Sequence, residues 1–142
     1  MSLDAYEPII DRMVEIIKDV WEVDRVIVGE PQHDPQDPQW AVIDCNGIER
    51  TREGPRAILE RHSFDIIGIF PRQPGDREQV FLLGKAKVLI DELEADTVFV
   101  TNLANNLMVT NAGRLEELPT EQERCGCFVR LTVDSFDHAP AD

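Results

Sequence analysis

Two stretches of the chain carry apolar residues at the three- and four-residue spacing of an amphipathic helix. The first runs from Pro8 to Trp21 and places on one side Ile10, Met13, Val14, Ile17, Val20 and Trp21. The second follows Asp76, a residue type common at helix starts, and places on one side Leu82, Leu83, Ala86, Leu89, Ile90 and Leu93. The pattern therefore predicts two main helices. The first helix begins near Asp4, if Asp4 and Glu7 form a capping box, or near Pro8, which suits a first helical turn.

Shorter apolar runs, bounded by turn residues, predict strands at 25–28, 40–45, 60–70, 107–118 and 125–135. The fourth of these is expected to break near residues 111–113. Asn46-Gly47 follows the second run and favours the type I′ turn of a tight hairpin, so a return strand is expected at 48–51.

Three segments lack a clear helix or strand pattern. Residues 30–39 contain three prolines and no apolar residue, which predicts an exposed loop. Residues 95–106 are ambiguous, because Thr97 to Val100 favours a strand while the neighbouring asparagines favour turns. Residues 137–142 are expected to form a flexible C-terminal tail.

This order of elements describes an α+β fold. We expect a single domain over residues 1–142, with an antiparallel sheet of four to five strands and two main helices packed on it. A chain of 142 residues buries roughly two thirds of the surface that its unfolded form exposes, so it needs neither a metal nor a disulfide to fold.

The charge limits the classes of partner. The chain has 14 basic and 28 acidic residues, a net charge of −14, which repels nucleic-acid phosphate. No three Lys or Arg residues cluster in the sequence, so sequence-specific nucleic-acid binding is not expected. No apolar run approaches the ~20 residues of a membrane span, and the N-terminus lacks the pattern of a secretory signal. These features predict a cytoplasmic protein without membrane contact.

Cys125 and Cys127 raise the question of a metal or redox site. On a strand they share one face with Val129, Leu131 and Val133, so they continue an apolar row and act as small buried residues. A structural zinc would need further ligands, such as Cys45 with His33, His62 or His138, and no metal-binding spacing supports that alternative.

Catalytic patterns are equally weak. His62, Ser63 and Asp65 contain the residue types of a catalytic triad, but strand alternation places His62 on the opposite face from the other two. We therefore predict no catalytic, cofactor-binding or metal-binding residues.

The second helix carries an unexplained apolar pair. With Leu83 placed at zero degrees, the apolar stripe from Gln79 to Leu93 occupies an arc of about 120°, and Phe81 and Val88 fall together on the opposite side. Either a loop such as 95–106 covers them, or they contact another subunit. Trp40, beside the proline-rich loop, is a second candidate interface residue, with a core position as the alternative. The predicted interface residues are Phe81, Val88 and Trp40.

Several segments together resemble the tail terminator (tail completion) proteins of long-tailed bacteriophages and prophages. They are the N-terminal helix, the strand Trp40-Ala-Val-Ile-Asp44, the strand Arg61-His-Ser-Phe-Asp-Ile-Ile-Gly68, the helix after it, and the closing Cys127-Phe-Val-Arg-Leu-Thr-Val133. The resemblance covers nearly the whole chain and lies in size, element order and strand composition.

The resemblance implies a structural protein rather than an enzyme, without cofactors. Such a protein forms a hexameric ring on the finished tail tube, ends its polymerisation and provides the surface to which the head joins. Its partners would be other copies of itself, the tail tube protein and a head-completion or connector protein. It would occur in the host cytoplasm during assembly and then in the virion tail.

Two alternatives remain open at this stage. One is a small cytoplasmic enzyme that depends on a metal or on His62, which bound stoichiometric metal would favour. The other is an oligomeric adaptor unconnected with phage, which differs only in its partners.

Overall fold

The computed structural model describes residues 2–29, 35–55, 57–96, 106–115 and 124–138. The elements along the chain are α1 (Ser2–Trp21), β1 (Val26–Val28), β2 (Trp40–Arg52), β3 (Ala57–Pro71), α2 (Arg77–Ala95), β4 (Asn106–Arg114) and β5 (Arg124–His138). The strands form one five-stranded sheet in the order β1-β2-β3-β5-β4. β1 runs parallel to β2, and the other neighbours are antiparallel. The predicted single α+β domain with five strands and two helices is confirmed, but the sheet is mixed rather than wholly antiparallel, because β1 is parallel to β2.

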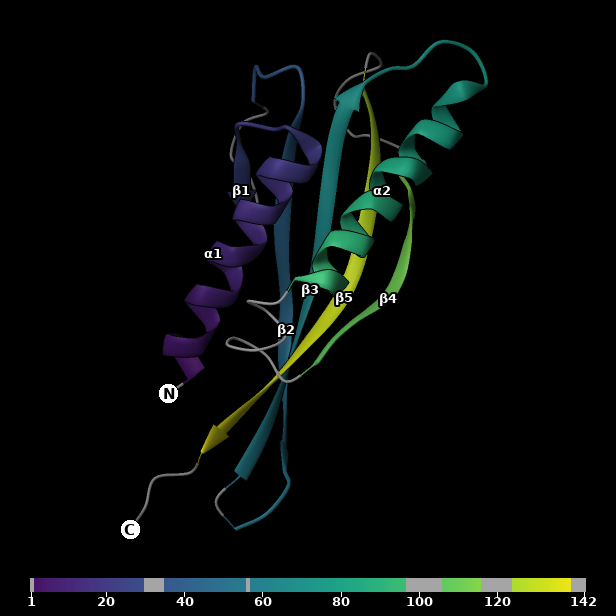
Figure 1. Ribbon diagram of the computed structural model, residues 1–142. Coiled ribbons are helices and arrows are strands. Elements are labelled where there is room, and N and C mark those ends of the chain that lie inside the picture. Colours follow the sequence, from purple (N-terminus) through teal and green to yellow (C-terminus); the bar gives the residue numbers. More distant parts are fainter. Residues whose placement is uncertain (1, 30–34, 56, 97–105, 116–123, 139–142) are drawn as a thin grey trace.

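Both helices lie on the same face of the sheet, with α1 over the β1–β2 side and α2 over β3, β5 and β4 (Figure 1). β2, β3 and β5 continue past the lower ends of the helices in this view, so one end of the sheet extends beyond the helical layer. Neither helix in the described ranges is long and apolar enough to cross a membrane.

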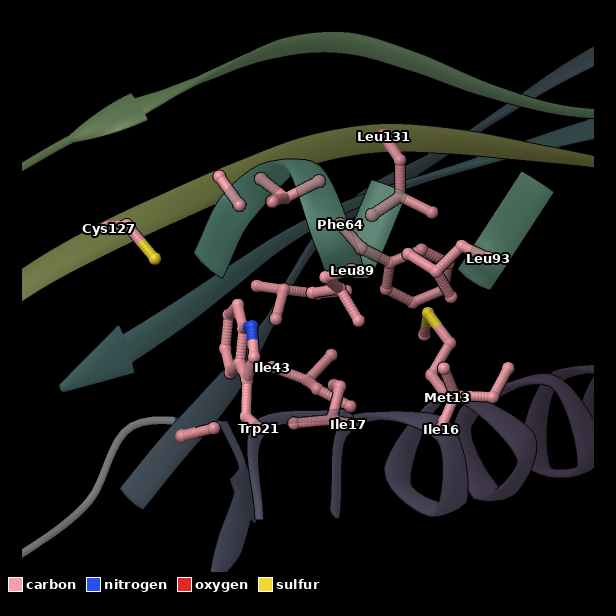
Figure 2. Close-up of a cluster of buried hydrophobic side chains, with 14 of the residues drawn as sticks. Met13, Ile16, Ile17, Trp21, Ile43, Phe64, Leu89, Leu93, Cys127 and Leu131 are labelled. Carbon is pink, nitrogen blue, oxygen red and sulfur yellow. The ribbon is translucent and has the colours of Figure 1, made fainter. Parts of the chain in front are cut away.

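The main core fills the space between the helices and the sheet. Figure 2 shows Met13, Ile17 and Trp21 of α1 pointing toward Leu89 and Leu93 of α2, in the same cluster as Ile43, Phe64 and Leu131 of the sheet. All five of these side chains are fully buried, and burying an aliphatic or aromatic side chain stabilises a fold by about 1.5–3 kcal/mol. The helix spacing predicted from the sequence therefore corresponds to real packing.

Trp21 of α1 contacts both β3 and α2. Its ring packs edge-on against Phe70 of β3, with the centroids 5.4 Å apart, and its Nε1 donates a hydrogen bond of 2.9 Å to the backbone oxygen of Lys85 in α2. Gly68 makes room for this ring, because a Cβ at position 68 would lie 2.7 Å from carbons of both Trp21 and Phe70. A glycine is required here by close packing rather than by its backbone angles.

The tight hairpin predicted at Asn46-Gly47 is wrong. Neither residue has a positive φ, and β2 continues through them to Arg52, with an irregularity in register between Cys45 and Gly47. The chain instead turns between Arg52 and Ala57, where the Glu53 amide donates to the Ala57 oxygen at 2.9 Å. Continuous pairing of β2 with β3 overrides the local turn preference, because it satisfies more backbone groups than an early turn would.

Several element ends also differ from the predictions. α1 begins at Ser2, earlier than either predicted start, and Asp76 precedes α2 without a side-chain capping hydrogen bond. β5 extends to His138, into the predicted tail, and residues 139–142 lie outside the described part. Most of the ambiguous segment 95–106 and half of the loop 30–39 also lie outside it. The break expected near residues 111–113 is wrong, because β4 continues through them paired with β5, with only an irregularity in register between Val109 and Asn111.

The packing around Gly68 gives a prediction for stability. Gly68→Ala should lower the free energy of unfolding by about 1–3 kcal/mol, because the new methyl group must displace two aromatic rings. Gly47→Ala is the matched control, since nothing lies within 4 Å of a Cβ at that position. Urea unfolding of the two variants compares them directly, and equal stabilities would contradict the close approach of Trp21.

Candidate assembly surface

The two cysteines of β5 are part of the core, as predicted. Cys125 and Cys127 are buried on the helix-facing side of the sheet, in one row with Val129, Leu131 and Val133. Burial raises the pKa of Cys125 to about 11 and that of Cys127 to about 12. Both thiols are therefore protonated at neutral pH, which suits packing and disfavours metal binding or nucleophilic attack.

The alternative of a zinc site gains no support from the described part of the chain. No group of three or more His, Cys, Asp or Glu side chains there could hold a metal ion. Cys45 stands opposite Phe64 in the β2–β3 register, and His33 lies outside the described residues.

A polar cluster occupies the helix-facing side of the sheet near its extended end. Glu60 and His62 of β3 are both buried there. The Nε2 atom of His62 lies 3.2 Å from Oγ of Ser135 and 3.7 Å from Oε1 of Glu60, while Nε of Arg50 lies 3.1 Å from Oε2 of Glu60. The sequence did not reveal this cluster, because its members come from three strands whose register was unknown.

The geometry of the cluster differs from that of a catalytic triad. In a triad the nucleophile and the orienting carboxylate contact opposite nitrogens of the histidine. Here Ser135 and Glu60 both approach Nε2, and the Glu60 distance is too long for a hydrogen bond. The predicted separation of His62 from Ser63 and Asp65 is confirmed, since Asp65 lies on the other face and accepts a 2.8 Å hydrogen bond from Arg130.

The predicted orientation of α2 requires a correction. The buried stripe consists of Leu82, Ala86, Leu89 and Leu93, whereas Leu83, which was predicted to belong to it, is 51% exposed. Phe81 is half-buried and packs edge-on against Phe70, with the ring centroids 5.7 Å apart. Phe81 is one residue before the buried Leu82, about 100° around the helix, so it lies at the flank of the core. Phe81 therefore does not lie opposite the stripe, and its role in an interface stays a prediction.

Val88 does face outward. It is 49% exposed and shares its side of the helix with Val80, which is 69% exposed, and with Gly84, one turn from each. We call Val80, Gly84 and Val88 the outer row of α2. A glycine in an exposed helix interior costs about 1 kcal/mol relative to alanine, and a Cβ at Gly84 would have nothing within 4 Å. The packing of the described residues does not require a glycine there.

Trp40 lies on the face of the sheet opposite the helices. It is only 8% exposed and packs with Val42 and Ile69, against which Ile27, Ile67 and Leu115 also pack. Trp40 is therefore buried in the isolated chain, as the alternative prediction of a core position stated. Its role in contacts between subunits stays a prediction.

The end of the β2–β3 hairpin is the second outward-facing feature. We call residues 46–61 the hairpin arm, whose described residues, 46–55 and 57–61, reach beyond the ends of both helices in Figure 1. Residues 46–53 are all exposed, and Ile48 is among the large apolar residues that face solvent. β1 pairs with β2 only up to Ile43, so the outer edge of β2 from Asp44 onward has no partner strand among the described residues.

The corrected orientation of α2 predicts a large loss of stability for one substitution and almost none for another. Phe81→Glu should lower the free energy of unfolding by about 2–3 kcal/mol, because it removes contacts with Phe70 and places a carboxylate at the core edge. Val88→Glu should change it by less than about 0.5 kcal/mol, as expected for an exposed position. Urea unfolding of dilute protein measures both, and equal losses would contradict the orientation.

The polar cluster predicts a pH dependence of stability. Burial lowers the pKa of His62, against opposing contributions from Glu60 and Asp134. Because the unfolded chain binds this proton more readily, the free energy of unfolding should fall as pH drops below about 6.5, the ordinary histidine pKa. His62→Gln should reduce this loss, and the comparison excludes effects of the other two histidines. Identical pH profiles for the two proteins would show that His62 is not held neutral.

Comparison with known proteins gives no family assignment. No protein-family model matches the chain, and no curated protein matches it significantly. The resemblance to tail terminator proteins therefore depends on the sequence features already described, and the function must be argued from the chain's own surfaces.

Proposed function

We propose that this chain is a structural phage or prophage tail protein, which forms a ring on the tail tube, ends its polymerisation and provides the surface for head joining. The proposal combines the resemblance in element order with one feature of the structure, the hairpin arm. A ring requires a head-to-tail contact, in which one surface of each subunit contacts a different surface of the next. The arm is suited to such a contact by its shape and its charge.

The charge of the arm is opposite to that of the rest of the chain. Residues 46–61 contain four arginines and three glutamates, a net charge of +1. The whole chain has a net charge of −14, so the other residues together carry −15. An arm of one subunit would therefore be attracted to the acidic body of the next, whereas two arms would gain no such attraction.

The exposed side of α1 offers an acidic complement. Glu7, Asp11 and Glu15 are exposed and follow one another at four-residue spacing, so they form one row along the helix. Arg12 pairs with Glu15 at 2.8 Å, but like charges at this spacing still repel one another. Arginines from a neighbouring subunit would relieve that repulsion, and Arg50 and Arg52 lie on the exposed part of the arm.

The acidic character also suits a component through which DNA passes. A surface with a net charge of −14 gives phosphate no counter-charge over most of its area, so DNA would not adhere to it. The family would place such a ring between the tail tube and the head.

The enzyme alternative would use His62, and it makes a different prediction for purified protein. It requires stoichiometric metal or hydrolytic activity that is lost on His62→Gln. The buried cluster around His62 offers one ring nitrogen to two partners, an arrangement that serves packing better than proton transfer. The structural role is therefore the stronger proposal.

Deletion of the gene tests the proposed role. In the phage or prophage that carries it, deletion should give tails longer than normal that fail to join heads, as seen by electron microscopy. Tails of normal length in a clean deletion would contradict the proposal.

Complementation of the deletion then tests the arm. Arg52→Glu should restore tail length poorly, because it reverses a charge in the contact. Arg72→Glu changes the net charge equally at an exposed site just after β3, at the other end of the sheet, and should complement normally. Equal complementation by both variants would show that the arm does not mediate the contact.

A further inference from the structure

The outer row of α2 is an apolar surface that the described part of the chain leaves uncovered. Val80, Leu83 and Val88 are three of the six large apolar residues exposed in the described ranges, and all three lie on this helix. The row of Val80, Gly84 and Val88 points away from the buried stripe, so the core does not account for it.

Gly84 lies at the centre of this row and leaves an open space. A Cβ at this position would contact nothing within 4 Å, and the residue has no positive φ that would require glycine. A glycine flanked by two valines one turn away forms a shallow depression in a helix surface. Such a depression allows a second helix to approach closely, with its own ridges packed beside the valines.

Two exposed residues of opposite charge, Arg77 and Asp91, lie at equal distances from Gly84 along the helix. Arg77 is seven residues before Gly84 and Asp91 is seven residues after it, while Val80 and Val88 are four residues before and after. Both charged side chains are exposed and fall on the side of the helix that carries the row. The pattern is therefore self-complementary, with apolar residues matched to apolar residues and a cation matched to an anion.

We propose that the outer row of α2 binds the same row of a second copy of this chain, in an antiparallel contact with a two-fold axis at Gly84. In that contact Val80 packs against the partner's Val88, and Arg77 faces the partner's Asp91, each twice by symmetry. A parallel arrangement would instead place Arg77 beside the partner's Arg77. The charge pattern thus favours a second copy of this chain as the partner, with the two α2 helices antiparallel.

The ion pair already present on the helix does not prevent this contact. Lys87 and Asp91 are 2.7 Å apart, but both side chains are largely exposed. Exposed pairs of this kind contribute little to stability, so Asp91 can accept a second cation at small cost. Among the described residues, Arg77 has no ion-pair partner within the chain.

This inference goes beyond the proposed function and does not depend on it. A two-fold contact closes on itself as a pair, whereas a ring needs a head-to-tail contact. The two contacts use different surfaces, the outer row and the hairpin arm. If both form, two rings associate through α2; if only the two-fold contact forms, the chain is a dimer in solution.

A charge-swap experiment on the purified full-length protein tests the contact. Sedimentation equilibrium over a wide concentration range should show wild-type protein associating in even-numbered units. Arg77→Asp and Asp91→Arg should each raise the dissociation constant about tenfold or more, because each places two pairs of like charges in the contact. The double variant should return to near the wild-type value, since the pairs are restored in reversed order.

Controls separate this result from a general effect of charge or stability. Lys18→Asp makes the same charge change as Arg77→Asp, apart from the type of cation, at an exposed position of α1 and should leave association unchanged. Gly84→Leu should abolish the pair by filling the depression, and urea unfolding should show that the variant remains folded. Gly84→Cys should form a disulfide between two copies on mild oxidation, whereas Lys18→Cys should not.

Three outcomes would overturn the inference. They are a wild-type chain that stays monomeric at the highest concentration, association in even-numbered units that persists in Gly84→Leu, and a double variant that associates no more tightly than the single variants. The two proposals can fail separately. Tail termination by the Gly84→Leu variant tests only whether the ring forms without the α2 contact, and sedimentation of the same variant tests only the α2 contact.

Discussion

The longest strands of this chain are longer than its helices, and this difference determines which part of the sheet is left uncovered. β3 and β5 each contain 15 residues, which extend about 50 Å at ~3.3 Å per residue. α1 contains 20 residues and α2 contains 19, which extend only about 30 Å at 1.5 Å per residue. One layer of helices therefore cannot cover the full length of the sheet, and a hairpin arm must extend beyond it.

The side chains along β3 follow this division. Phe64, Ile66 and Phe70 lie under the helices in the core, whereas Glu60 and His62 continue the same face toward the arm. The polar pair stays buried because Ser135 and Arg50 from the neighbouring strands provide hydrogen-bonding and charged partners. The cluster thus marks the place where the helix-covered sheet becomes an arm, and a structural role explains its residues without catalysis.

The opposite face of the sheet carries no helix in the described part of the chain. Directly paired residues form ion pairs across its strands there, with Arg61 2.9 Å from Asp134 and Arg130 2.8 Å from Asp65. In each pair an exposed arginine contacts a largely buried carboxylate, and a shift in register would separate them. They favour one register for the long strands, and so help to position the arm relative to the helices.

The sequence predicts features that depend on local periodicity, but it does not predict features that depend on contacts between distant segments. Alternation placed Cys125 and Cys127 correctly, because their row of apolar neighbours is continuous. The Asn46-Gly47 turn failed because pairing with β3 extends past it. The orientation of α2 could not be resolved, since its apolar residues span a wide arc and only contact with Phe70 places Phe81 inside and Leu83 outside. The contact of Arg50, Glu60 and Ser135 could not be predicted, because it depends on the register of three strands.

The two proposed contacts depend on different forces, which makes their effects separable. The arm contact is an attraction between an arm of net charge +1 and a body of −15, and salt screens such attraction beyond ~8 Å at physiological ionic strength. The α2 contact buries valines around a glycine, and strongly hydrated salts such as sulfate strengthen apolar burial. Two acidic chains also repel each other, and screening reduces that repulsion. Salt also screens the two Arg77–Asp91 pairs of the α2 contact, but the buried valines remain. Increasing salt therefore weakens head-to-tail association more than two-fold pairing, so ionic strength would shift the balance between the two assemblies.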